Sequence, residues 1–257
     1  MLRNLRLALG NHPEQDGKPE AIIDRVVRNF SRGAAELACS LHWTPDFVRQ
    51  SIRLEGKEHL DACLRRGRGV IALTAHLGNF ALIGTRLAAE GYTFNALIKN
   101  PPDRRFAKLL DTARLQIGQK TISARPRIEA AKNVLKSLKH NEIVLIVADE
   151  YKHNGISVEF FGHQVPSARG PATLAMRSGA AVVPMFLFWE DEGLRLRVDS
   201  SLPLVNSGES QKDIEENTAM FAKCLETAIR NRPDQWNWLN LRLQERRKSV
   251  SPRPARF

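Results

Sequence analysis

The chain has 257 residues, of which 42% are hydrophobic and 26% charged, and its formal net charge is +11. This composition is typical of a folded protein with one large or two small domains, and it excludes long disorder except at the ends. No apolar run reaches the roughly 18–20 residues of a membrane-spanning helix, so we expect any membrane contact to be peripheral. The cysteines, Cys39, Cys63 and Cys224, form no CxxC pair or Cys/His cluster. We therefore expect no disulfide and no zinc site, and reduced thiols fit a cytoplasmic compartment.

The positive charge is concentrated in two zones of the sequence. Residues 95–139 contain eleven Lys and Arg against three acidic residues, a net charge of +8. Residues 241–257 contain six Lys and Arg against Glu245, a net charge of +5. Such zones are either solvated surfaces or binding surfaces for a phospholipid layer, a phosphorylated substrate, an acidic carrier protein or nucleic acid. No nucleic-acid-binding motif accompanies them, so we expect no nucleic-acid partner.

The first 50 residues are predicted to form an N-terminal helical cap, although residues 1–19 are mixed and end in a turn-rich patch. Apolar residues recur at helical spacing from residue 21 to residue 41, with arginines on the opposite side. Thr44 and Pro45 are typical of a helix start, with Thr44 as the capping residue. Residues 51–55 alternate like a short strand, and residues 57–65 resemble a short helix.

The middle of the chain alternates apolar strands with amphipathic helices. Strands are predicted at residues 70–73, 94–98, 143–148, 181–188 and 194–198, and helices at 80–90, 104–116, 128–139, 171–178 and 212–231. This alternation predicts an α/β fold with a mostly parallel or mixed central sheet flanked by helices on both sides. We predict an N-terminal helical, membrane-proximal segment at 1–50, an α/β domain at 51–247 and a basic tail at 248–257.

His76 is the first candidate for a chemical role. It follows the predicted strand at 70–73 and precedes a helix, at the carboxyl end of a strand, where open α/β sheets place their ligands. Gly78 allows a tight turn, and the N–H groups at the start of the helix could bind a phosphate or a developing oxyanion. His76 could then act as a general base that takes a proton from a hydroxyl group. The alternative is a structural or surface histidine.

Four blocks of the sequence are distinctive: RLEGKEHLDACLRRGRGVIALTAHLGNF (53–80), IVADE (146–150), VEFFGHQVPSARGPATLAMRSGAAVVPMFL (158–187) and PDQWNWLNLR (233–242). In this order they resemble the lipid A biosynthesis acyltransferases, within the glycerolipid acyltransferase superfamily. The resemblance implies an α/β sheet flanked by helices and an O-acyltransferase that needs no metal and no cofactor. It also implies acyl carrier protein or coenzyme A as the thioester donor. The acceptor would be a lipid A precursor or a related glycolipid. The implied location is peripheral, on an anionic membrane surface at the cytoplasmic face of the bacterial inner membrane.

The resemblance also implies roles for individual residues. His76 matches the family's catalytic base, and Asp149 matches the aspartate of its second block. For substrate binding the matching residues are Asn79, Arg125, Arg127, Glu159, Arg169 and Gly170. Of these, Arg125 or Arg127 would suit an acceptor phosphate.

Three features depart from the family pattern. Family members carry an acidic residue five positions after the histidine, where this chain has Ala81. Glu150 stands where the family usually has glutamine. One hypothesis is that Asp149, Glu150 or Glu159 supplies the missing carboxylate, which would orient the imidazole. The alternatives are that His76 acts with water or another partner, or that the chain is a catalytically impaired relative that binds lipid or carrier protein.

The third departure is at the start of the sequence. The hydrophobic anchor that family members usually carry is absent before residues 3–10. There are three interpretations: a shortened form, a misplaced start codon, or a form held at the membrane by its basic and amphipathic surfaces. Near the other end, we expect Trp236 and Trp238 to pack in the core, with a membrane interface as the alternative.

Overall fold

The computed structural model describes residues 1–10 and 19–239. The predicted basic tail at 248–257 lies outside the described residues. Within the described part of the chain, no helix is both long enough and apolar enough to cross a bilayer.

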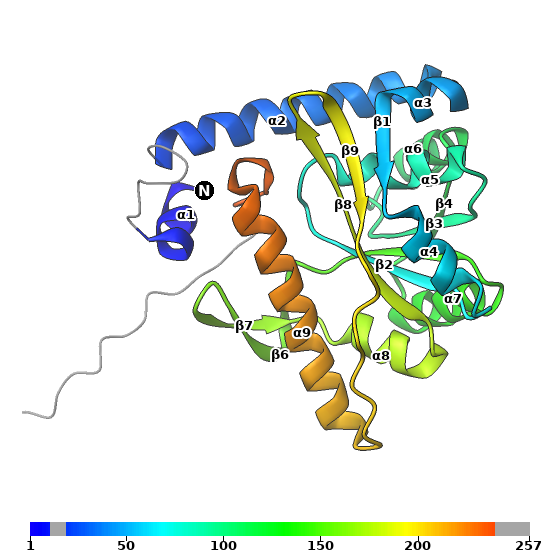
Figure 1. The fold of residues 1–257 in the computed structure, drawn as a ribbon, viewed down its shortest axis with the longest axis vertical. Helices are drawn as coiled ribbons and strands as arrows, with labels where there is room; N and C mark the ends of the chain where they lie inside the picture. Colours follow the sequence, from blue (N-terminus) through cyan, green and yellow to red (C-terminus); the bar gives the residue numbers. More distant parts are fainter. Residues whose placement is uncertain (11–18, 240–257) are drawn as a thin grey trace, which may run out of the picture.

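A mixed, mostly parallel sheet of seven strands forms the centre of the described structure (Figure 1). The strands lie in the order β1 (Ile52–Glu55), β9 (Gly193–Val198), β8 (Ala181–Glu190), β2 (Val70–Thr74), β5 (Ile143–Val147), β3 (Phe94–Ile98) and β4 (Gln119–Ser123). Neighbouring strands are parallel except β8 and β9, which form an antiparallel pair. The predicted α/β fold with a mostly parallel or mixed sheet is confirmed.

The central strand β2 shows why the sheet needs helices on both faces. All five of its residues are buried. Ile71 and Leu73 belong to one hydrophobic cluster, and Val70 and Ala72 belong to another. Because successive side chains of a strand point to opposite faces, each face of the sheet has its own core. A strand buried on both faces is continuously apolar, as in parallel sheets generally.

Helices cover both faces of the sheet. The first cluster includes buried residues of α7 (Arg127–Lys139), α8 (Gly170–Ser178) and α9 (Ser210–Asn231). The second includes residues of α3 (Pro45–Ser51), α4 (Lys57–Leu64) and α5 (Ile83–Ala89). The helix α6 (Arg104–Gln116), between β3 and β4 in the sequence, buries none of its residues.

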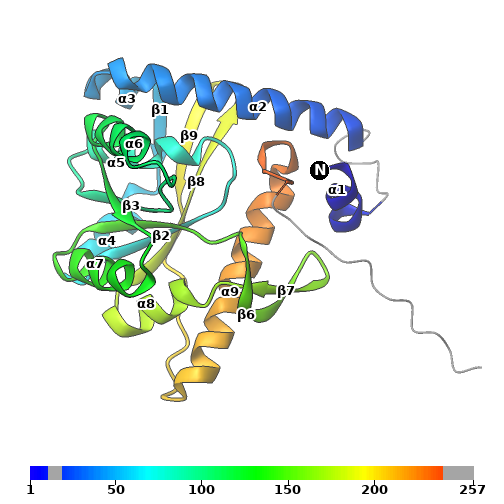
Figure 2. The same ribbon diagram turned by 180° about the vertical axis from the view of Figure 1, so that it is seen from behind.

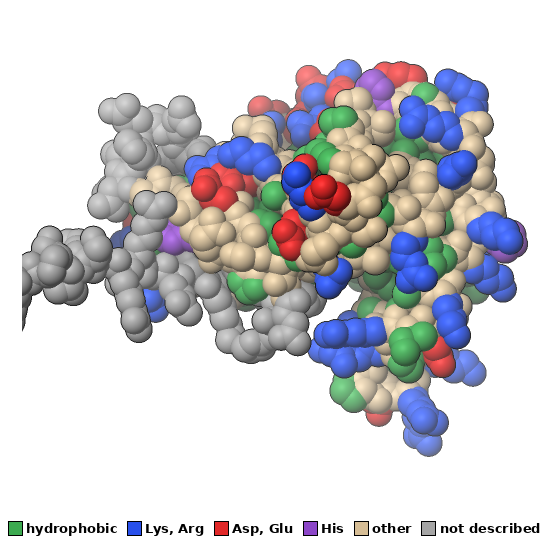
Figure 3. All heavy atoms as spheres, turned by 90° about the horizontal axis from the view of Figure 1, so that it is seen from below, with side chains coloured by type: hydrophobic (Ala, Val, Ile, Leu, Met, Phe, Trp, Pro, Cys, Tyr) green, Lys and Arg blue, Asp and Glu red, His purple; other side chains and the backbone are tan. Residues whose placement is uncertain are grey.

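Figure 3 shows one face of the molecule. Lys and Arg side chains are scattered over this face, mostly on the side opposite the residues drawn in grey.

The predicted N-terminal helical cap consists of α1 (Leu2–Leu9) and α2 (Pro19–Cys39), followed by the 3-10 helix η1 (Ser40–His42). Figures 1 and 2 show α2 lying across one end of the molecule, beside the turn between β8 and β9. Ile22 and Val26 of α2 are buried in the first cluster. Thr44 caps α3 as predicted, because its hydroxyl accepts a hydrogen bond from the backbone N–H of Phe47.

Some elements differ from the predictions. The helix predicted at 80–90 is divided into the 3-10 helix η2 (Phe80–Leu82) and α5. The edge strand β4 has the polar sequence QKTIS, which has too weak an apolar pattern to be recognised. The antiparallel pair β6 (Tyr151–Phe160) and β7 (His163–Ser167) was also not predicted. The last element, η3 (Pro233–Gln235), packs against α2 and leads into the buried Trp236 and Trp238. The expected core packing of these two tryptophans is confirmed.

Candidate active site

His76 and Asp149 meet at the carboxyl ends of two neighbouring strands. In the parallel pair of β2 and β5, Thr74 lies opposite Val147. His76 and Asp149 each follow two residues later, so the register of the strands brings them to the same place at the edge of the sheet. The Nδ1 atom of His76 lies 2.8 Å from Oδ1 of Asp149.

Asp149 is held by N–H donors on both of its carboxylate oxygens. Its Oδ2 accepts hydrogen bonds from the backbone N–H of His76, at 2.8 Å, and from Nε1 of Trp236, at 2.7 Å. Its side chain is 3% exposed, whereas the His76 side chain is 24% exposed. The carboxylate is therefore fixed in position, and it favours the imidazole tautomer with a proton on Nδ1.

The backbone at Gly78 and Asn79, just after His76, is held by close packing and by hydrogen bonds to other segments. Gly78 has a φ of +58°, and a Cβ there would lie 1.9 Å from the carbonyl oxygen of Leu187, so only glycine fits. The N–H of Gly78 donates to the carbonyl of Gln235, and the N–H of Asn79 donates to the carbonyl of Leu187. These two N–H groups have carbonyl partners, so neither is available for the anion-binding role expected at the start of this helix.

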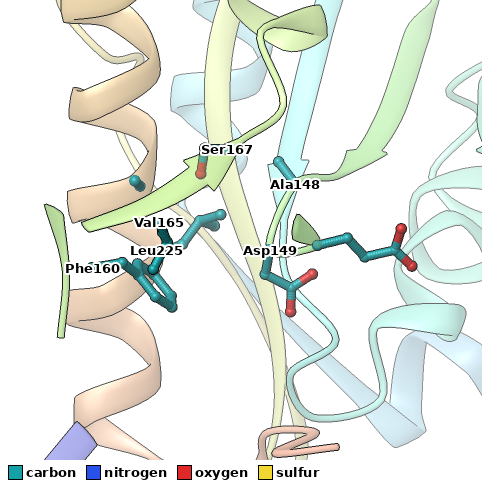
Figure 4. A pocket seen from close by; sticks show the side chains of 8 residues that line it. Ala148, Asp149, Phe160, Val165, Ser167 and Leu225 are labelled. Atoms are coloured by element: carbon teal, nitrogen blue, oxygen red, sulfur yellow. The ribbon is translucent and has the colours of Figure 1, made fainter. Parts of the chain in front are cut away.

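Two hollows lie beside the His76–Asp149 pair. The first is lined by Val26, Phe30, His76, Gly78, Phe80, Trp189, Gln235, Trp236 and Asn237. The second is lined by Ala148, Asp149, Glu150, Phe160, Val165, Ser167, Ala222 and Leu225. Figure 4 shows the second hollow, with the Asp149 carboxylate directed away from Phe160 and Val165. His76 therefore borders the first hollow and Asp149 the second, and both hollows are partly apolar.

The three carboxylates proposed to replace the missing motif acid have different positions. Asp149 contacts His76, as described above. Glu150 is exposed and lines the second hollow, and Glu159 is exposed on β6 opposite Gln164. Ala81 lies in η2, where its carbonyl accepts a hydrogen bond from Nε2 of Gln119.

The residues expected to bind substrate do not form one cluster with His76. Arg125 and Arg127 are exposed, at the carboxyl end of β4 and the start of α7. β4 is three strand positions from β2, or about 14 Å at about 4.8 Å per strand. Arg169 is exposed at the N-cap of α8, hydrogen-bonded to Gln211, and Gly170 is the first residue of that helix. Asn79 is 4% exposed, and its Nδ2 donates to Glu36 of α2. Substrate binding by these residues stays a prediction.

Sequence reasoning missed three residues that contact this site or its loop. Trp236 donates to Asp149, Trp189 lines the hollow beside His76, and Glu36 accepts from Asn79. Trp236 lies in the quoted block PDQWNWLNLR, which was the available signal. Glu36 lies on α2 and in no motif, so only the packing of α2 against the loop identifies it.

Comparison with known proteins shows the family of the chain. Residues 1–245 match the family described as bacterial lipid A biosynthesis acyltransferase. The chain belongs to this family. The chain is 27% identical over 242 residues to the phosphatidylinositol mannoside acyltransferase of Mycolicibacterium smegmatis. The aligned part covers 92% of this chain and 76% of that protein. The proteins of the same name from two Mycobacterium tuberculosis strains are 27% identical over 190 residues, or 72% of this chain. The match spans 57% of the length of these two relatives.

Proposed function

We propose that this chain is an O-acyltransferase that moves a fatty acyl group from a thioester donor to a hydroxyl group of a glycolipid. The observation that carries this proposal is the hydrogen bond between His76 and Asp149 at the carboxyl ends of β2 and β5. A histidine oriented by a buried carboxylate is a suitable general base. Apolar side chains beside His76, among them Phe30, Phe80 and Trp189, suit a substrate with an apolar chain.

In the proposed mechanism His76 first accepts a proton from the acceptor hydroxyl and then donates it to the leaving group. Asp149 holds the proton on Nδ1, so Nε2 accepts the proton of the acceptor hydroxyl as its oxygen attacks the thioester carbonyl. The new C–O bond forms and the C–S bond breaks. The leaving thiolate takes the proton from the imidazolium, which restores His76. Asp149 stabilises the imidazolium without being protonated itself.

The proposed substrates follow from the family and from the walls of the hollows. Phe30, Phe80 and Trp189 give the hollow beside His76 apolar surfaces for an acyl chain. Relatives named phosphatidylinositol mannoside acyltransferases and the lipid A family favour a phosphorylated glycolipid as acceptor. Arg125 and Arg127 follow β4, a strand about 14 Å from β2 across the sheet, and would meet the phosphate of such a large headgroup. Acyl carrier protein or coenzyme A would supply the thioester.

We propose that the enzyme works at the cytoplasmic face of the bacterial inner membrane, as a peripheral protein on an anionic lipid surface. The family and the basic zone at residues 95–139 support this location. Ala81 at the motif position had suggested a catalytically impaired, lipid- or carrier-binding relative. The contact between Asp149 and His76 favours the enzyme over that alternative, because the imidazole has a buried carboxylate partner without the motif acid.

The experiment is acyl transfer by the purified chain with two donors and two acceptors. The donors are a radiolabelled acyl-coenzyme A and the same acyl group on acyl carrier protein. The acceptors are a lipid A precursor and a phosphatidylinositol mannoside, in detergent or in vesicles. We expect labelled glycolipid product with at least one pair. Binding to vesicles with no product from any pair, and no thioester cleavage, would favour the impaired relative.

A further inference from the structure

Glu36 of α2 contacts the loop that follows His76, although it is distant from that loop in sequence. Its Oε2 accepts a hydrogen bond from Nδ2 of Asn79 at 2.8 Å. Both of its oxygens lie within hydrogen-bonding distance of Nε1 of Trp189, at 3.1 and 3.0 Å. Arg32, one turn earlier, pairs with Oε1 at 2.7 Å. The Glu36 side chain is 18% exposed, so the network is largely shielded from water.

The packing of α2 keeps this carboxylate in place. Gly33 lies one turn before Glu36, and a Cβ there would be 3.1 Å from the Trp189 ring and 3.7 Å from Cγ of Asn79. The helix backbone therefore lies directly against both partners of Glu36. One turn before Gly33 on α2, Asn29 donates to the backbone carbonyl of Asp234 at 2.9 Å. The inner face of α2 is thus attached to the His76 loop, to β8 and to η3.

Both partners of Glu36 belong to the surroundings of His76. Asn79 is three residues after His76 and is 4% exposed. Trp189 is 7% exposed and forms a wall of the hollow that His76 lines. Without Glu36, Asn79 and Trp189 would keep buried N–H donors that have lost this acceptor, and buried unsatisfied donors drive local rearrangement. A rearranged loop would move the imidazole relative to bound substrate.

We propose that Glu36 is a positioning residue for His76, acting through Asn79 and Trp189. The expected change in kcat rests on the proposed acyl transfer. The expected change in the position of the His76 ring does not. Misplacement of a catalytic group by about 1 Å costs roughly 100-fold in rate. We therefore expect Glu36→Ala to lower kcat for thioester cleavage by roughly 10- to 100-fold, with the donor KM within about threefold.

Two further variants serve as comparisons for Glu36→Ala. Glu36→Gln keeps an oxygen that can accept from Asn79 and Trp189, so we expect it to recover most of the lost kcat. Glu20→Gln, on the same helix, is the matched control. Glu20 pairs with Arg6 at 2.6 Å, and both side chains are more than half exposed. We expect its kcat to remain within about twofold of wild type, because exposed ion pairs contribute little.

The experiment combines steady-state kinetics with NMR of the histidine rings. Thioester cleavage is measured well below the melting temperature of each variant, and His76 resonances are assigned by their loss in His76→Gln. We expect Glu36→Ala to shift or broaden the His76 ring signals, with smaller changes in Glu36→Gln and none in Glu20→Gln. Unchanged His76 signals, or a kcat for Glu36→Ala within threefold of wild type, would overturn the proposal. Because the NMR readout needs no activity, an inactive wild type would refute the proposed function and still leave this inference tested.

Discussion

Asp149→Asn changes the chemistry of His76 while keeping the shape of the site. Oδ2 of Asp149 accepts two N–H groups, from the backbone of His76 and from Trp236, whereas Oδ1 faces Nδ1 of His76. An asparagine has one carbonyl oxygen, and that oxygen must stay with the two donors. Its NH₂ group then faces Nδ1 and forces the imidazole proton onto Nε2. In the proposed mechanism the imidazole can then no longer accept a proton from the acceptor hydroxyl.

The expected loss is large because the tautomer itself is wrong. The same substitution in the Ser-His-Asp arrangement costs about 10⁴-fold in kcat, so we expect a loss of roughly 10³- to 10⁴-fold here. At about 1.36 kcal/mol per factor of ten, this is about 4–5.5 kcal/mol in the barrier. The fold should survive, since asparagine still accepts from Trp236 and from the backbone of His76.

The assay is cleavage of a radiolabelled acyl-coenzyme A with and without glycolipid acceptor. Glu150→Gln is the matched control, because Glu150 is the next residue and is exposed. We expect this control to keep its rate within about twofold. The reasoning is refuted if Asp149→Asn stays within tenfold of wild type, or if Glu150→Gln loses as much activity as Asp149→Asn.

Three further predictions concern stability and reactivity. Leu73→Ala, at a fully buried position of β2, should lower the free energy of unfolding by about 2–5 kcal/mol in urea titrations; a loss below 1 kcal/mol would contradict the core assignment. The Ser207 hydroxyl and backbone N–H groups hold the pKa of Asp213 below its usual range. Asp213 therefore stabilises the fold at neutral pH, and the advantage of wild type over Asp213→Asn should shrink as the pH falls below about 4; a constant difference down to pH 2 would refute this. Burial raises the pKa of Cys224 to about 11, so a thiol reagent at pH 7 should modify the exposed Cys39 first, and equal rates would be the contrary result.

The fold was largely predictable because its strands have strong patterns. The apolar strands β2 and β5 are buried on both faces, and short apolar runs of this length between amphipathic helices are typical of buried strands. The polar edge strand β4 was missed because an edge position needs little apolar surface. The hairpin of β6 and β7 was missed too, although the end of β6 and all of β7 lie in the quoted block at 158–187. Family resemblance identified the block but not its secondary structure.

The site was only partly predictable, for a reason of geometry. His76 was found from its place after a strand, and the partner carboxylate was narrowed to Asp149, Glu150 or Glu159. Choosing among them requires the register of β2 against β5, which pairs Thr74 with Val147 and which periodicity does not reveal. Glu36 was not predictable at all, because its role depends on how a separate helix packs on the loop.

The most direct test of the proposed chemistry compares wild type with His76→Ala in one preparation. Acyl transfer to glycolipid is measured by mass spectrometry of the product, and donor binding is measured separately with a non-cleavable thioester analogue. We predict that His76→Ala binds the analogue within about threefold of wild type and loses at least roughly 10³-fold in the rate of product formation. Product formation by His76→Ala within tenfold of wild type would contradict the proposed role of His76 as the general base.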